Sequence, residues 1–130
     1  SPPPARVQVF ILDSLVKDAV VRNTAGDDLG HIRDLLLDLA EARIVAAVLT
    51  TARYLGLGGK YYVIPWDAFE KRSADNVYIL DIPKEKLARA PTFDINWTEN
   101  ITPDYLNMIF GYYGYRPYWE ESRVNLLPST

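Results

Sequence analysis

A glycine-rich stretch limits the folds open to this chain more than any other feature. The sequence ARYLGLGGKYYVIPW, residues 52–66, has three glycines among four positions, followed by an aromatic and β-branched run that ends in Pro65-Trp66. Glycine reaches left-handed dihedral angles at low steric cost, and proline is confined to the ends and edges of strands. The stretch therefore predicts a loop that reverses the chain before a short strand.

The same stretch does not match the known phosphate-binding loops. A P-loop needs two glycines five positions apart, then Lys and a hydroxyl residue, but Tyr54 stands five positions before Gly59 and Tyr61 follows Lys60. A Gly-x-Gly-x-x-Gly motif that starts at Gly56 has Tyr61 in place of its third glycine. We therefore interpret the loop as a structural turn, with a ligand contact as the alternative.

The region before this loop allows two interpretations. Residues 31–54 contain many leucines and alanines, which are good helix formers, so a single helix is one of them. The segment IVAAVLTT, residues 44–51, is instead typical of a buried strand, and it follows a charged turn at residues 41–43. The pattern favours two strands over the helix.

The remaining elements are short. We expect strands at residues 20–22, 61–66 and 76–82, a turn over NTAGDDLG at residues 23–30, and helical turns at residues 13–17 and 66–70. Pro83 is expected to open a helix over residues 84–90. Thr102 is the expected cap of a helix that starts at Pro103 and covers residues 102–110, before an irregular aromatic arm at residues 111–121.

Composition narrows the class of protein. A chain of 130 residues with 48 % hydrophobic residues favours one domain with a modest core. A net charge of −3 argues against sequence-independent binding to nucleic acid. The absence of cysteine excludes disulfides, thiolate metal sites and cysteine nucleophiles. The longest apolar run, residues 44–49, is too short to span a membrane.

Chemistry-bearing residues are sparse. His31 is the only histidine, and no serine has a His-Asp partner pattern around it. Asp34 and Asp38 are four positions apart and suit a hard cation, but two solvated carboxylates are the preferred interpretation. We therefore expect no catalytic residue, no cofactor and no bound metal.

The order of small features over residues 14–90 resembles the PRC-barrel domain family, the small β-barrel named for the cytoplasmic part of the photosynthetic reaction centre H subunit. The matching positions form a Gly-Asp turn, an Ile-x-Asp strand start, a Val-x-x-Val-Leu strand, a glycine loop and a Pro-Trp strand end. They are Gly26, Asp27, Gly30, Ile32, Asp34, Asp38, Val45, Val48, Leu49, Leu55, Gly56, Gly58, Lys60, Pro65 and Trp66. The chain departs from the family at Ala52-Arg53, where a glycine pair is usual, and at residues 41–43, where glycine is frequent.

The resemblance implies a mainly β fold: a small barrel of short antiparallel strands, with short helices and an aromatic-rich C-terminal extension. It decides for strands over residues 31–54, and closure into a barrel would remove exposed sheet edges. Residues 1–13 would be a leader, 14–90 the barrel, and 91–130 an extension that packs on the barrel or on a partner. The inward positions would be Ile32, Leu36, Val45, Ala47, Leu49, Val63 and Ile79, or those of the alternate register.

The resemblance also implies a function. In the reaction centre subunit and in a ribosome maturation factor, the barrel is an interaction platform without chemistry of its own. We therefore expect a non-catalytic protein-interaction or scaffold module, with a protein partner or a homodimer, no nucleic acid and no membrane span. The alternative is a small-ligand or metal-binding barrel whose pocket uses the loop at 53–60 and the aromatic arm.

Aromatic residues concentrate at the C-terminal end, where residues 91–130 hold nine of the sixteen. Tyr, Trp and Arg dominate interface hot spots, so these rings suit core packing, a homodimer interface or contact with another partner. The candidate interaction residues are Tyr54, Leu55, Leu57, Trp66, Tyr112, Tyr113, Tyr115, Arg116, Tyr118 and Trp119.

Overall fold

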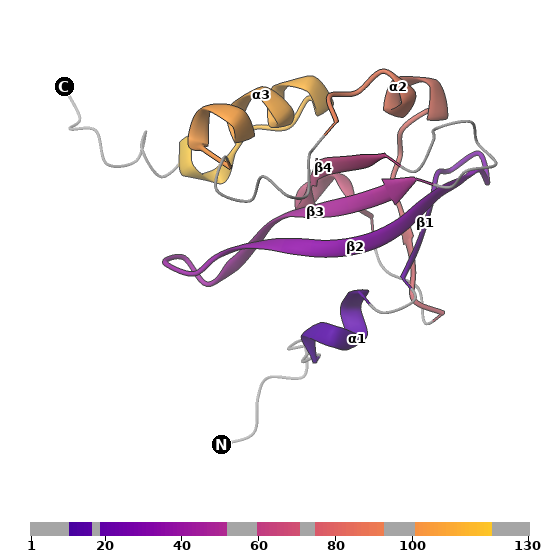
Figure 1. The fold of residues 1–130 in the computed structure, drawn as a ribbon, viewed down its shortest axis with the longest axis horizontal. Helices are drawn as coiled ribbons and strands as arrows, with labels where there is room; N and C mark the ends of the chain where they lie inside the picture. Colours follow the sequence, from indigo (N-terminus) through magenta and orange to yellow (C-terminus); the bar gives the residue numbers. More distant parts are fainter. Residues whose placement is uncertain (1–10, 17–18, 52–59, 71–74, 93–100, 121–130) are drawn as a thin grey trace.

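The computed structural model describes residues 11–16, 19–51, 60–70, 75–92 and 101–120. These residues form a mainly β fold, with one five-stranded sheet in the order β4-β3-β2-β1-β5 and helices on both sides of it (Figure 1). The elements in chain order are α1 (Leu12–Val16), β1 (Val20–Arg22), β2 (Asp28–Asp38), β3 (Arg43–Thr51), β4 (Tyr61–Pro65), the 3-10 helix η2 (Trp66–Ala68), β5 (Val77–Ile79), α2 (Lys84–Ala88) and α3 (Pro103–Tyr113).

The longest part of the sheet is the hairpin of β2 and β3. Their antiparallel pairing runs from Gly30 opposite Thr51 to Asp38 opposite Arg43, with two irregularities along β2. The prediction of two strands in this region is confirmed, and the alternative of one helix over residues 31–54 is wrong. The β-branched residues of β3 fit a pleated sheet better than a helix, because their side chains are restricted at χ1.

One strand pair differs from the expected arrangement. β1 pairs with β5 in parallel, with Val21 opposite Tyr78, whereas the other named pairs are antiparallel. The prediction of antiparallel strands alone is therefore wrong, since β5 joins β1 through a crossover and not through a hairpin. Within the described residues the sheet is open, with β4 and β5 at its two ends, although a single bridge joins Phe69 to Leu80.

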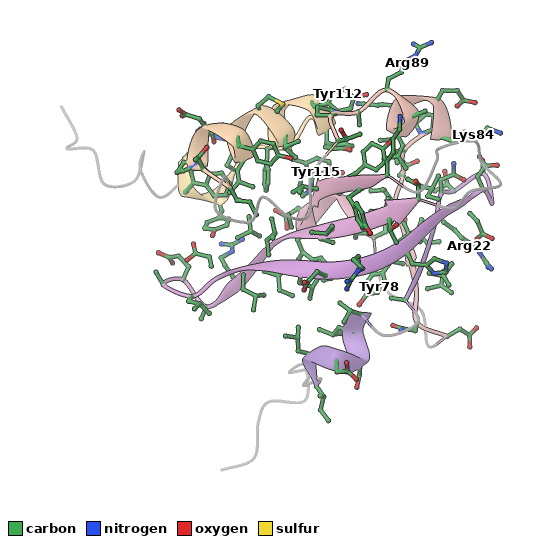
Figure 2. All side chains as sticks on the ribbon, viewed as in Figure 1. Arg22, Tyr78, Lys84, Arg89, Tyr112 and Tyr115 are labelled. Carbon is green, nitrogen blue, oxygen red and sulfur yellow. The ribbon has the colours of Figure 1, made fainter. Side chains whose placement is uncertain are left out.

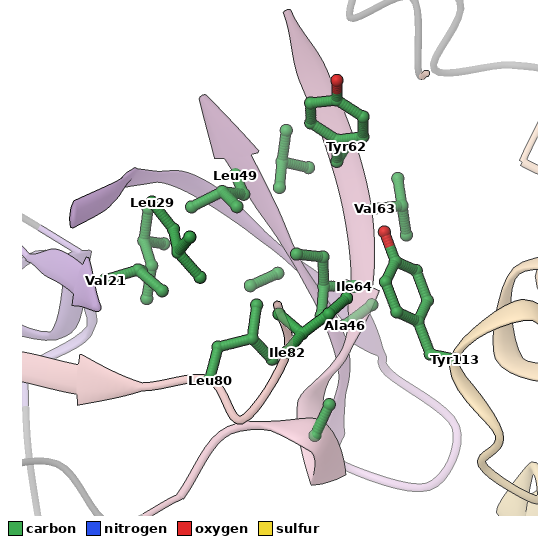
Figure 3. Packing of buried hydrophobic residues seen from close by; sticks show 14 of the residues in the cluster. Val21, Leu29, Ala46, Leu49, Tyr62, Val63, Ile64, Leu80, Ile82 and Tyr113 are labelled. Atoms are coloured by element: carbon green, nitrogen blue, oxygen red, sulfur yellow. The ribbon is translucent and has the colours of Figure 1, made fainter. Parts of the chain in front are cut away.

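The core lies on both faces of β3. Every residue from Val45 to Leu49 is buried, so β3 does not alternate between a buried and an exposed face. Helix α3 contacts β4 and contributes Ile109, Phe110 and Tyr113 to the core, while α1 contacts β2 (Figures 1 and 3). A choice of one inward register is therefore wrong for β3, because layers on both sides of the sheet bury both faces.

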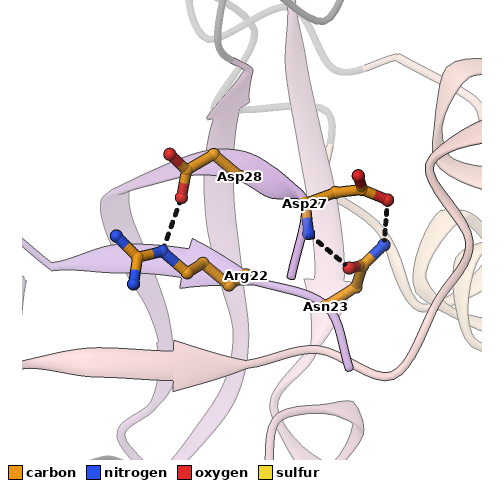
Figure 4. A network of polar contacts seen from close by, with 4 residues as sticks. All are labelled: Arg22, Asn23, Asp27 and Asp28. Atoms are coloured by element: carbon orange, nitrogen blue, oxygen red, sulfur yellow. Dashed lines mark hydrogen bonds and ion pairs between the residues drawn. The ribbon is translucent and has the colours of Figure 1, made fainter. Parts of the chain in front are cut away.

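The turn between β1 and β2 is held by a buried asparagine. The side chain of Asn23 accepts a hydrogen bond from the amide of Asp27 at 2.8 Å, and donates to the Asp27 carboxylate at 3.0 Å and to the Ile82 carbonyl at 3.3 Å (Figure 4). Beside it, Arg22 and Asp28 form an ion pair at 2.7 Å. Through Asn23, the turn between β1 and β2 is therefore joined to Ile82, in the segment that follows β5.

Gly30 lies inside β2 and not in the turn where the sequence placed it. Its φ angle of +139° belongs to a region that favours glycine. A Cβ atom there would lie 2.0 Å from the carbonyl oxygen of Thr50 on β3. The glycine therefore allows the backbones of β2 and β3 to approach each other closely, next to the point where the pairing of β1 with β2 ends at His31.

Helix α3 begins as predicted and ends later. The Thr102 hydroxyl accepts a hydrogen bond from the Tyr105 amide at 3.1 Å, Pro103 opens the helix, and Gly114 ends it with a left-handed φ of 81°. The aromatic arm predicted at residues 111–121 is therefore partly wrong, because residues 111–113 are helical and residues 118–120 form a further helical turn. None of the helices among the described residues has the length and hydrophobicity to span a membrane.

Candidate interaction site

The distal half of the β2–β3 hairpin extends beyond its neighbouring strands. β1 pairs with β2 only as far as His31, and β4 pairs with β3 only from Ala46 onward. Residues 33–45 therefore form a two-stranded ribbon, which we call the arm, and it projects from the rest of the sheet (Figure 1). Over Arg33–Asp38 of β2, the edge that faces away from β3 has no strand partner among the described residues.

A cavity of about 780 Å³ lies between the arm and the C-terminal helices, and we call it the groove. Its walls are mostly apolar and come from two segments that are more than fifty residues apart in sequence. They consist of Asp34, Leu35, Leu36, Leu37, Asp38, Leu39, Val45, Ile101, Pro103, Leu106, Tyr118 and Trp119. Two of the leucines are strongly exposed, Leu37 at 45 % and Leu39 at 86 %.

The aromatic wall of the groove is fixed from two sides. The Tyr118 hydroxyl donates a hydrogen bond to the Asp38 carboxylate on the arm, and the guanidinium carbon of Arg43 lies 3.7 Å from the centre of the Tyr118 ring. The Trp119 indole donates to Asn107 on α3 at 3.0 Å and packs on Phe110, with ring centres 5.2 Å apart. The helical turn at 118–120 is thereby joined to both the arm and α3.

The charged side chains that line the groove are both acidic. The Asp34 carboxylate accepts the amide of Leu35 at 2.8 Å. The Tyr118 hydrogen bond, helped by the amide of Glu41, lowers the pKa of Asp38 below its ordinary value. Burial, together with the hydrogen bond to Asp38, raises the pKa of Tyr118 to about 12. At neutral pH the groove therefore presents the ionised carboxylate of Asp38 beside a tyrosine that keeps its proton.

The structure separates the aromatic residues that the sequence grouped as an interaction surface. Tyr118 and Trp119 line the groove, whereas Trp66 packs on Phe69 and Tyr78, with ring centres 5.6 and 5.7 Å apart. Tyr54, Leu55 and Leu57 lie outside the described residues. The described residues do not test whether Tyr54, Leu55 and Leu57 belong to an interaction surface, so that part of the prediction stays a prediction.

The tyrosines of α3 and its end lie elsewhere. The Tyr112 hydroxyl donates to the carbonyl of Lys86 at 2.6 Å, and Tyr113 is buried, where burial raises its pKa. Tyr115 is 37 % exposed and lines a hollow of about 100 Å³ beside residues 80–83, which join β5 to α2. Arg116 is exposed. Tyr112 and Tyr115 lie on the side of the sheet that α2 and α3 cover (Figure 2). Tyr112 therefore joins α3 to α2 and does not reach the groove.

Ten of the twelve groove residues were not among the candidate interaction residues from the sequence, among them Leu36, Leu37, Leu39 and Leu106. The leucines at residues 35–37 and 39 enter the sequence prediction as helix formers, and Leu36 also as an inward position of the barrel. In a strand, however, neighbouring side chains point to opposite faces, so three consecutive leucines place apolar side chains on both faces. That pattern was available in the sequence and indicates a second apolar surface on β2.

The groove lacks the residue combinations of a metal centre. Among the described residues, no group of three or more His, Asp or Glu side chains is placed to hold a metal ion. His31 is exposed on β2 opposite Thr50, outside the groove. What the groove offers is apolar contact area, two carboxylates and a stretch of β2 that, among the residues that the structure describes, pairs with a strand on one side only.

Comparison with known protein families gives one match. The model of the PRC-barrel domain matches residues 8–87, which is more than half of the chain. No curated protein matches the sequence.

Proposed function

The chain belongs to the PRC-barrel domain family, whose domains generally mediate protein interactions, and on that premise we propose that it is a non-catalytic module that binds another protein through the groove. The observation that carries the proposal is the apolar groove with Leu37 and Leu39 exposed at its border. Contiguous exposed apolar surface is rare on proteins that act alone, and it marks interaction sites when polar residues surround it.

The folded unit of this module is, in our proposal, residues 14–90 arranged as a barrel, with a leader over residues 1–13. Residues 91–130 are the extension that supplies the second wall of the groove. Support for this division comes from the lining itself, since Ile101, Leu106 and Trp119 face the arm across the cavity. The site exists only where the two parts of the chain meet.

The proposed role is without catalysis, and the hydrogen bonds of the two carboxylates that line the groove support this part of the proposal. Asp38 accepts the Tyr118 hydroxyl, and Asp34 accepts the Leu35 amide. A general acid or base needs a proton to exchange at the operating pH, and the lowered pKa of Asp38 opposes that. The proposed role of these groups is electrostatic selection of a partner.

The experiment places a photo-crosslinking amino acid at Leu39, in the groove wall, and in a second variant at Ile11, which is outside it. The two side chains are 86 % and 75 % exposed, so neither substitution disturbs the core. In cells of the natural source, we expect a defined protein adduct from position 39 and not from position 11. Equal labelling from both positions, or none from position 39, contradicts the proposed function.

A second candidate function is binding of a small apolar ligand in the same groove. A volume of about 780 Å³ falls within the usual range of ligand pockets, about 300–1,000 Å³. Native mass spectrometry of chain purified from its source distinguishes the two. A constant added mass of small-molecule size, lost in a Leu106→Asp variant, would favour the ligand over the protein partner.

A further inference from the structure

The shape of the groove indicates how a partner would enter it. Its lining includes six consecutive residues, Asp34 to Leu39, and only Val45 from β3. Side chains of one strand face alone would contribute every second residue. A run of consecutive residues fits a groove that follows the backbone of β2, and an irregularity between Leu36 and Leu37 also interrupts the alternation there. Over this stretch β2 has no strand partner on the edge away from β3 among the described residues.

That backbone is suited to a further strand. β2 residues from Arg33 to Asp38 are extended and hydrogen-bond to β3 on one side only within the described chain. An unpaired, apolar strand edge is a template for main-chain pairing, and addition of a strand to such an edge is a common mode of peptide recognition. At about 3.3 Å per residue, the stretch accommodates a partner strand of about six residues.

The charges of the groove restrict the sequence of the partner. Asp34 and Asp38 line it, no basic side chain does, and the nearby Arg43 guanidinium is stacked on the Tyr118 ring. The Asp34 carboxylate holds the amide of its own neighbour, Leu35. A partner carbonyl that takes this amide would release the Asp34 carboxylate to pair with a cation.

We propose that the partner binds as an extended strand that pairs with the β2 edge over Arg33–Asp38, inserts alternate apolar side chains into the groove, and places a Lys or Arg beside Asp34. This inference rests on the proposed function and names the chemistry of the partner segment. Leu36, Leu37 and Leu106 supply the apolar contacts, main-chain hydrogen bonds supply the orientation, and the carboxylates discriminate against acidic sequences.

The probe is a phage-displayed library of random peptides, about twelve residues long to exceed the strand length, selected against the full chain. We expect the enriched peptides to alternate apolar and polar residues and to contain a Lys or Arg. One enriched peptide is then synthesised with and without N-methylation of alternate backbone amides. Because N-methylation removes strand hydrogen bonds but keeps the side chains, it should weaken binding at least about tenfold.

Matched variants of the protein test the site. Leu37→Lys places a charge in the groove wall, while Leu12→Lys places it on α1, where the leucine has a similar exposure, 50 % against 45 %. Leu37→Lys should weaken peptide binding about tenfold or more, as loss of an interface contact does, and Leu12→Lys should not change it.

Asp34→Asn tests the charge of the site. The variant keeps an acceptor for the Leu35 amide, so it should reduce only the preference for a cationic over a neutral peptide, by about threefold.

Amide hydrogen exchange measured by NMR reports the strand pairing directly. Amides at the β2 edge between Arg33 and Asp38 should exchange rapidly in the isolated chain and become protected when peptide is bound. Protection in the isolated monomer would mean that the chain covers this edge itself. Protection that rises with protein concentration would mean that a second copy covers it. Either result overturns the proposal.

Three further results overturn the strand proposal: no enriched peptides, enrichment of acidic peptides, or equal binding of the N-methylated peptide. These results are distinguishable from failure of the proposed function. If a partner protein still crosslinks at position 39 while the N-methylated peptide binds as well as its parent, the groove binds protein and the strand mode alone is wrong.

Discussion

At the scale of single residues, a Cβ atom at position 30 would lie 2.0 Å from the Thr50 carbonyl oxygen and 2.9 Å from the Cα of Thr51. Backbone atoms cannot move away as a flexible side chain does, and φ at this position is +139°. We therefore expect Gly30→Ala to lower the free energy of unfolding by about 2–4 kcal/mol, measured by urea denaturation.

The control for this prediction is Gly111→Ala in α3, where an added Cβ meets nothing within 4 Å. Alanine is the better helix former by about 1 kcal/mol, so this variant should be as stable as the parent chain or more stable. Equal losses in the two variants would mean that the close approach of β2 and β3 at Gly30 does not matter for stability.

Asp38 should link stability to acid pH. The Tyr118 hydroxyl and the Glu41 amide each lower the pKa of Asp38 in the folded chain by more than burial raises it, and the Arg43 charge lowers it slightly further. A carboxyl with a lower pKa in the folded state stabilises that state above its unfolded pKa, about 3.9. This contribution is lost as the pH falls through the folded pKa.

The measurement is an NMR titration of the Asp38 carboxyl carbon in the parent chain and in Tyr118→Phe. We expect the parent pKa to lie below 3.8 and the variant pKa to be higher, with a smaller loss of stability in acid. Tyr115→Phe, which removes a hydroxyl from a half-exposed ring that does not line the groove, is the control. A pKa that is unchanged in Tyr118→Phe would contradict the assigned hydrogen bond.

At the scale of elements, the turn at residues 23–27 depends on Asn23, which is 5 % exposed. Asn23→Ala leaves the Asp27 amide and the Ile82 carbonyl without this partner. A polar group that loses its partner in a buried site costs about 1–3 kcal/mol, so we expect thermal and urea unfolding to show a loss of about 2–3 kcal/mol. Thr24→Ala removes one exposed hydrogen bond, to Asp81 at 3.1 Å, and should cost less than about 1 kcal/mol.

At the scale of the whole molecule, α3 is part of the core and not an appendage of it. Phe110 is 1 % exposed beneath Trp119, whereas Met108 on the same helix is 48 % exposed. Phe110→Ala should cost about 3–5 kcal/mol, a large fraction of the total stability of a domain. Met108→Ala should cost about 0.5 kcal/mol or less. Because Trp119 lines the groove and packs on Phe110, Phe110→Ala should also weaken partner binding, and tryptophan fluorescence follows both effects.

Much of the local structure was predictable because it depends on neighbours in sequence. Thr102 and Pro103 start a helix through the chemistry of a cap and a first turn, and the structure has that start. The β-branched residues of β3 and the Pro-Trp end of β4 predicted strands that the structure contains. The end of α3 was missed because its last turn is aromatic, and burial of Tyr113 against the core outweighs the weaker helix propensity of such residues.

The sequence by itself determined the family, the mainly β character and the positions where glycine and proline are needed, because these follow from short-range sterics and side-chain patterns. Only the tertiary structure decided the parallel β1–β5 pair, the burial of both faces of β3, and the groove between the arm and Trp119. Each of these depends on residues far apart in the chain, and pairings of that kind are decided by packing and by which strand edges remain available. The candidate site arises from that long-range packing, since neither the leucines of β2 nor the aromatic residues after α3 form it alone.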